Sequence, residues 1–126
     1  MKTLIKKSVK TFKLTGDDND YVLTITISTD AQVNTNVRYL ATINDLYDGS
    51  DDVITVDIIQ GKRLRIRHIF DFSGINDSLL DPAMQHTSIM YTLRGQDNMV
   101  LPFEKNTKAD LSPMKRIISV KVINIK

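Results

Sequence analysis

Cysteine and tryptophan are both missing from this chain of 126 residues. Without cysteine the protein can form no disulfide, no thiolate nucleophile and no cysteine-based zinc site, so packing alone must stabilise its fold. Internal repeats, low-complexity tracts and linkers are absent as well. The length therefore predicts a single domain, residues 1–126, built around one core.

Long hydrophobic runs are also absent. A signal peptide needs an uninterrupted apolar core of about 7 residues or more, but MKTLIKKSVKTF offers only Leu4 and Ile5 before Lys6 and Lys7. The most apolar stretch elsewhere, IISVKVINI, contains Lys121 and is far shorter than the ~20 residues of a membrane helix. We expect a soluble protein without a signal peptide, cytoplasmic when it is made and virion-associated if it belongs to a virion, with no membrane contact.

Alternation with a period of two dominates what is present. The segment YVLTITIST, residues 21–29, places Leu23, Ile25 and Ile27 on one face and mostly threonine and serine on the other, which is typical of a half-buried strand. Seven strands are expected near residues 5–14, 21–29, 53–60, 63–72, 87–95, 98–104 and 116–125. Seven or eight short strands without a strong helix predict an all-β fold, a single antiparallel β-sandwich of jelly-roll or immunoglobulin-like topology.

Turn residues predict three hairpins between these strands. TGDDND joins the first two strands, QGK joins the third and fourth through Gly61, and GQDN joins the fifth and sixth. Gly61 should supply a positive φ. Pro102 cannot donate a ladder hydrogen bond, so the sixth strand is expected at a sheet edge.

Three regions fit the strand pattern less well. Residues 30–49 allow a helix or a strand, and we favour a strand over 37–43 flanked by loops. GINDSLLDPAMQH predicts a long loop with one helical turn after Asp77, broken by Pro82. The apolar residues of the last strand change parity, which indicates a β-bulge or burial on both faces.

The alternating apolar residues predict a core between the sheets. It should contain Leu23, Ile25, Ile27, Ile66, Phe70, Ile89, Leu93, Leu101 and Val120.

Only two histidines, His68 and His86, could act as acid–base groups at neutral pH. His68 lies on the apolar face of its strand, where a hydrogen-bonded core histidine is the favoured interpretation. His86 follows a loop with Asp81, and no serine arrangement resembles a nucleophilic motif. We expect no enzyme, no catalytic residue and no cofactor.

Two acidic clusters raise the question of calcium, which collects about six to eight oxygen ligands. Neither cluster matches a known calcium loop, and turn formation explains both, so no metal site is predicted. The clusters are GDDNDY, with Asp17, Asp18 and Asp20, and DGSDD, with Asp48, Asp51 and Asp52.

Charge is strongly segregated along the chain. Residues 1–15 carry five lysines and no acid, residues 16–60 carry nine acids and only Arg38, and residues 61–126 carry eleven bases and six acids. Such asymmetry predicts surface patches of both signs. The patches could neutralise one another within one sheet or orient copies of the protein.

The strand GKRLRIRHIFDF places Arg63, Arg65 and Arg67 on one face and its two phenylalanines on the other. Sheet proteins that bind nucleic acid usually interleave aromatic and basic residues on the same face, so this arrangement argues against nucleic acid. Arginine also pairs well with carboxylates at protein interfaces. We expect the three arginines to bind protein carboxylates, in the same molecule or in a partner.

Thr-rich hairpins such as YVLTITIST and TSIMYTLRG, in a small chain without cysteine or tryptophan, are similar to accessory and structural proteins of tailed phages and contractile particles. The resemblance implies a module that docks into a repeating assembly. The expected function is therefore a structural or interaction β-sandwich that associates with itself or a scaffold as an oligomer or assembly component. The alternatives are a carbohydrate- or calcium-binding surface module and a nucleic-acid-binding β-barrel.

Overall fold

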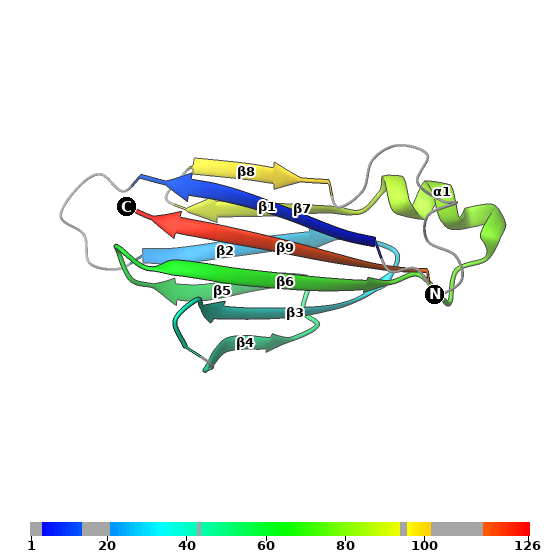
Figure 1. Ribbon diagram of the computed structural model, residues 1–126. Helices are drawn as coiled ribbons and strands as arrows, with labels where there is room; N and C mark the ends of the chain where they lie inside the picture. Colours follow the sequence, from blue (N-terminus) through cyan, green and yellow to red (C-terminus); the bar gives the residue numbers. More distant parts are fainter. Residues whose placement is uncertain (1–3, 14–20, 43, 94–95, 102–114) are drawn as a thin grey trace.

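The computed structural model describes residues 4–13, 21–42, 44–93, 96–101 and 115–126. This part of the chain forms nine strands and one helix (Figure 1). They are β1 (Leu4–Phe12), β2 (Tyr21–Ser28), β3 (Gln32–Tyr39), β4 (Asp45–Gly49), β5 (Val53–Ile58), β6 (Arg63–Asp71), α1 (Asp77–Gln85), β7 (Ser88–Leu93), β8 (Gln96–Val100) and β9 (Arg116–Ile125).

The strands form two sheets that enclose one core. The larger sheet has the order β1-β9-β6-β3-β4 and the smaller sheet the order β5-β2-β7-β8. Alternation builds the core: in β5, Ile54 and Val56 are buried while Val53 and Thr55 are exposed. The prediction of an all-β fold of two packed sheets is confirmed, with nine strands in place of seven or eight.

Strand pairing differs from two of the three predicted hairpins. β1 does not pair with β2 but lies parallel to β9, with Leu4 opposite Ile117. β5 and β6 belong to different sheets, so Gly61, with a φ of 84° as predicted, turns the chain from one sheet to the other. The third hairpin, β7 with β8, is confirmed, and β8 is an edge strand. Alternation predicts that a segment is a strand, but it does not predict its partner, because any neighbouring strand with a matching buried face can pair with it.

Three elements depart from their predicted bounds. β3 spans Gln32–Tyr39, whereas the predicted strand spans residues 37–43. The strand includes asparagine and threonine residues at 34–36 because its position between β6 and β4 overrides their local conformational preferences. The short strand β4 was not predicted. In residues 74–86 a nine-residue helix replaces the single turn, since Leu80, Ala83 and Met84 bury one face while Pro82 stays exposed.

The predicted core residues lie in the core except Leu101, which is 54% exposed, and Val120, which is buried on the outer face of the sheet opposite Arg67. Val100 points into the core at the end of β8, so Leu101 points away from it. In β9, Ser119, Val120 and Lys121 are buried in succession with no shift of register against β1 or β6. Burial on both faces, and not a β-bulge, thus explains the change of parity in this strand.

Within the described residues, no helix has the length and apolar character needed to cross a membrane.

Candidate functional site

The outer face of the five-stranded sheet carries the predicted arginine row. In β6 the odd-numbered residues point outward and the even-numbered residues point into the core, which leaves Arg63 exposed and Arg65 and Arg67 half-buried. β6 lies at the centre of its sheet, between β9 and β3. The row is therefore flanked by outward side chains from both neighbouring strands.

Arg38 of β3 joins this row in space. It lies directly opposite Arg65, and Asn36 lies opposite Arg67. We call Arg38, Arg63, Arg65 and Arg67 the arginine face. Sequence alternation could have placed Arg38 on an outward face, but only the pairing of β3 with β6 brings it beside Arg65.

The guanidinium groups of this face have no carboxylate partner among the described residues. The described residues do form ion pairs elsewhere, between His86 and Asp30 and between Lys115 and Asp77. The Nε atoms of Arg38 and Arg67 are buried and lack a hydrogen-bond acceptor in the described chain. Burial lowers the pKa of Arg65, and the charges of Arg38 and Arg67 lower it further. The cluster thus consists of like charges that form no ion pair with the carboxylates of the described residues.

Two acidic residues of the same sheet, Asp45 and Asp71, interact with residues outside the arginine face. Asp45 lies opposite Arg38 across β3 and β4, but its Oδ1 accepts a hydrogen bond of 2.8 Å from Asn36 Nδ2. Asp71 lies opposite Arg116. Hydrogen bonds from Ser73, and then the charge of Arg116, lower the pKa of Asp71.

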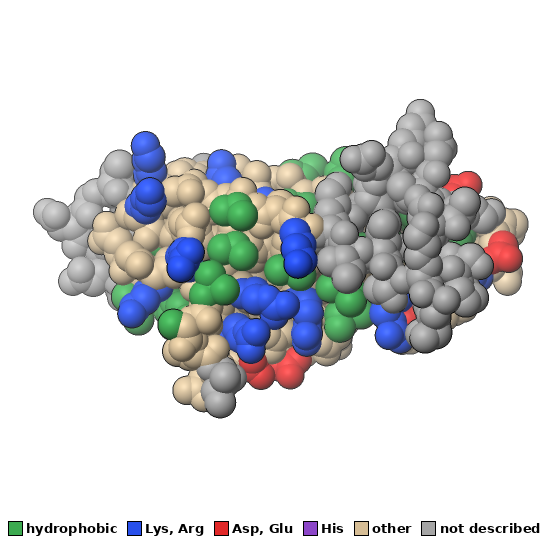
Figure 2. Space-filling model, in the orientation of Figure 1, with side chains coloured by type: hydrophobic (Ala, Val, Ile, Leu, Met, Phe, Trp, Pro, Cys, Tyr) green, Lys and Arg blue, Asp and Glu red, His purple; other side chains and the backbone are tan. Residues whose placement is uncertain are grey.

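An apolar stripe runs beside the arginine face. Val120 and Val122 of β9 lie opposite Arg67 and Arg65, and Val9 of β1 lies opposite Val122 and is 67% exposed. Figure 2 shows hydrophobic side chains on this face with basic side chains gathered beside them. The aliphatic parts of arginine side chains can cover such valines, which accounts for the burial of Val120 on an outward face.

Acidic side chains gather along one edge of the sandwich, formed by β4, the turn after it and β5. We call Asp45, Asp48, Asp51, Asp52 and Asp57 the acidic edge; all five are exposed. In Figure 2 acidic side chains appear at the border of the basic cluster, along the edge of the molecule. Both signs of charge predicted from the sequence therefore reach the surface as neighbouring but distinct patches.

The second acidic cluster is organised by a tyrosine. The Tyr47 hydroxyl donates a hydrogen bond of 3.0 Å to Asp51 Oδ2 and accepts one of 3.0 Å from the Asp51 amide. Among the residues that the structure describes, no three histidine or acidic side chains lie close enough to hold a metal ion. Asp17, Asp18 and Asp20 lie outside the described residues.

His68 is a buried structural residue. Its side chain is 0% exposed, with Nδ1 2.7 Å from Thr35 Oγ1 and Nε2 2.8 Å from the Tyr91 hydroxyl. Burial lowers the pKa of His68 to about 3, so the ring is neutral at neutral pH. Burial also raises the pKa of Tyr91. The interpretation of His68 as a hydrogen-bonded core histidine is confirmed.

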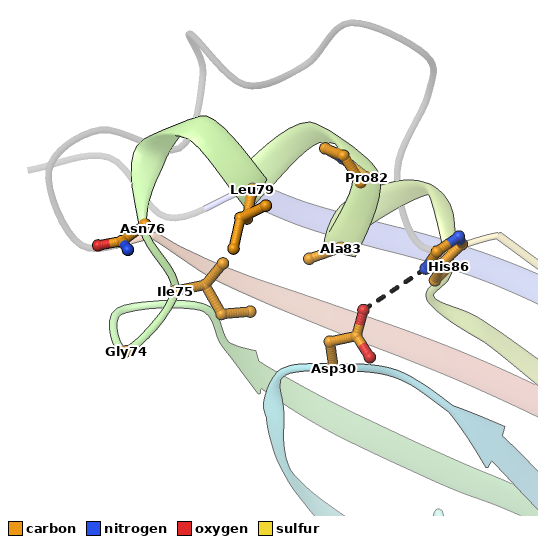
Figure 3. Close-up of a pocket in the computed structure, with 8 residues that line it drawn as sticks. All are labelled: Asp30, Gly74, Ile75, Asn76, Leu79, Pro82, Ala83 and His86. Atoms are coloured by element: carbon orange, nitrogen blue, oxygen red, sulfur yellow. Dashed lines mark ion pairs between the residues drawn. The ribbon is translucent and has the colours of Figure 1, made fainter.

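His86 lies at a hollow of about 360 Å³ beside α1 (Figure 3). Its Nδ1 is 3.5 Å from Asp30 Oδ2, and both side chains are largely exposed. The remaining lining is mostly apolar: Ile75, Leu79, Pro82 and Ala83, with Gly74 and Asn76. Among the described residues, the lining contains no serine, threonine, lysine or tyrosine that could serve as a nucleophile beside this histidine.

No protein-family model, curated protein or solved structure matches this chain. The arginine face, the apolar stripe and the acidic edge together form the candidate interaction surface of this chain.

Proposed function

We propose that this chain is a non-enzymatic interaction module whose arginine face binds carboxylates of another protein molecule, and that this molecule is a second copy of the chain. The observation that carries the proposal is the gathering of Arg38, Arg65 and Arg67 without a carboxylate within ion-pair distance among the described residues. The sequence predicts a protein carboxylate as the partner group, and the acidic edge supplies five carboxylates on every copy.

Pairing would relieve the repulsion within the arginine face. The charges of Arg38 and Arg67 lower the pKa of Arg65, and a carboxylate brought to this cluster by another molecule would compensate these charges. The planar guanidinium can bind a carboxylate through two parallel hydrogen bonds. The neighbouring apolar stripe adds surface that benefits from leaving water, and arginine beside apolar residues is the composition of protein interfaces.

The positions of the two patches favour head-to-tail association. Two arginine faces would repel each other, whereas the acidic edge of one copy complements the arginine face of the next. Such heterologous contacts generate rings or open filaments. A component of a larger assembly, such as a phage virion or contractile particle, would use this kind of contact, and the resemblance of the Thr-rich hairpins to phage proteins supports the same class.

Solution mass tests this proposal. Wild-type protein should form oligomers at low salt and dissociate at high salt, because salt screens exposed charge pairs. Arg65→Glu with Arg67→Glu should remain monomeric at low salt. Size-exclusion chromatography with light scattering measures all of these states.

Matched variants separate this contact from a general charge effect. Lys13→Glu with Lys126→Glu changes the net charge equally at exposed sites off the arginine face and should leave the mass unchanged. Asp48→Arg with Asp52→Arg should be monomeric alone but should associate when mixed with the Arg65→Glu/Arg67→Glu protein. A monomeric wild type, or salt-sensitive DNA binding that the arginine variant abolishes, would contradict the proposal.

A further inference from the structure

Lys121 is a lysine in the interior of the sandwich. Its side chain points from β9 toward the opposite sheet and is 4% exposed. Ser8 of β1 and Ile66 of β6 lie on either side of it in the sheet. Across the core, its Nζ lies 5.8 Å from the centre of the Tyr91 ring.

The Lys121 ammonium lacks the partner that a buried charge normally has. Buried lysines are almost always paired, because moving an uncompensated charge out of water is costly. No hydrogen bond or ion pair to Lys121 occurs among the described residues, and its ammonium group contacts the face of the Tyr91 ring. Burial, and then the charge of Lys10, lower the pKa of Lys121.

Lys10 brings a second positive charge to the same place. In β1 it lies on the same side of the sheet as Phe12, and its Nζ is 5.7 Å from the centre of the Phe12 ring. Lys10 is opposite Ile123, and Ser8 is opposite Lys121, so the two lysines are close neighbours on adjacent parallel strands. Both ammonium groups thus lie over aromatic rings and neither has a carboxylate partner among the described residues.

The two lysines lie toward one side of the sandwich, Lys10 on the edge strand β1 and Lys121 on β9 beside it. β1 and β8 are edge strands of the two sheets and run along the same side of the molecule (Figure 1). Gln96 Nε2 of β8 donates a hydrogen bond of 2.7 Å to the Lys13 carbonyl just after β1. Ser8, Lys10 and Asn98 are each half-buried along this side. β1 and β8 are not paired with each other, so a small molecule that displaces the side chains along this side would reach Lys121, which is itself 4% exposed.

We infer that this side of the sandwich is a binding site for a small oxyanion, a carboxylate or phosphate group, which pairs with the ammonium groups of Lys10 and Lys121. Ser8 adds a hydroxyl donor beside Lys121. Asn98, opposite Tyr91 in register, adds a side-chain amide whose N–H group can donate to an oxyanion. The inference does not depend on the proposed function, because these side chains lie on the other side of the sheet from the arginine face.

Titration of the full chain with sodium phosphate and, separately, with sodium acetate tests this site. At constant ionic strength maintained with sodium chloride, at least one oxyanion should cause saturable changes in the amide NMR signals of β1 and β9 around Lys10 and Lys121. Comparison of the two titrations shows whether phosphate or carboxylate binds more tightly. Chloride alone should not produce these changes.

Three variants complete the experiment. Lys121→Met keeps an unbranched side chain in the core and should abolish saturable binding, while Lys10→Gln should weaken it about tenfold, the effect of losing one favourable charge contact. Lys7→Gln removes the same charge from the outward face of β1 and should leave binding unchanged. The inference is overturned if neither oxyanion gives a saturable response, if Lys10→Gln binds as tightly as wild type, or if Lys7→Gln loses as much binding as Lys10→Gln.

Discussion

At the scale of single residues, His68 shows how a polar group joins the two sheets. Its ring contacts Thr35 in its own sheet and Tyr91 in the other, at 2.7 and 2.8 Å. The position of His68 among apolar residues was predictable from alternation in β6. Its partners were not, because they are 33 and 23 residues away in the chain.

This arrangement predicts a loss of stability in acid. In the folded protein the pKa of His68 is about 3, whereas in the unfolded chain it is about 6.5. Between these values the unfolded state binds a proton that the folded state excludes, so the contribution of His68 is complete above pH 6.5. It should then fall by about 1.4 kcal/mol for each pH unit down to about pH 3.

Urea unfolding at a series of pH values between 7 and 3 measures this slope. Glutamine can form two hydrogen bonds but does not titrate in this range, so His68→Gln should show a flatter pH dependence than wild type. Identical slopes for the two proteins would show that His68 does not contribute to acid unfolding.

At the scale of elements, the turn between β5 and β6 carries the chain from one sheet to the other. Gly61 has a φ of 84°, a region that glycine adopts without steric cost. Its amide donates a hydrogen bond of 2.7 Å to the Ile125 carbonyl, which attaches the turn to the end of β9. The turn residue was evident in the sequence, but a two-residue turn suits a hairpin equally well, so the crossing between sheets was not.

Replacing Gly61 with alanine should therefore destabilise the fold by about 1 to 2 kcal/mol, the cost of a left-handed conformation for a residue with a Cβ. Gly61→Asn should lose less, because asparagine tolerates this conformation better. Gly74→Ala is the matched control, since a Cβ meets nothing within 4 Å at either glycine but Gly74 does not share the positive φ of Gly61. Chemical denaturation of the three variants measures the differences, and equal losses at both glycines would contradict the role given to the turn.

At the scale of the whole molecule, one core holds both sheets together. Ile25 of β2 and Ile66 of β6 belong to different sheets, and both are 0% exposed within the same cluster. A domain of this size with a shared core is expected to unfold in one cooperative step. The surface is organised differently, with the arginine face and the acidic edge on separate parts of it.

Truncation of either isoleucine to alanine should lower the free energy of unfolding by about 2 to 5 kcal/mol. Because the core is shared, both variants should retain a single transition that has the same midpoint by far-UV circular dichroism and by tyrosine fluorescence. The exposed Ile59 provides the control, and Ile59→Ala should cost less than about 0.5 kcal/mol. Separate transitions for the two sheets would contradict a common core.

The sequence by itself determined most of the strands and most of their buried faces, where Gly61 turns and that three arginines share a face. These features follow from the local geometry of the extended backbone, in which side chains alternate. The tertiary structure alone decided the strand order, and with it the parallel pairing of β1 with β9, the position of Arg38 beside Arg65 and the approach of Lys10 to Lys121. Strand partners more than a hundred residues apart, such as Leu4 and Ile117, depend on how all the buried faces pack together, which no local pattern specifies.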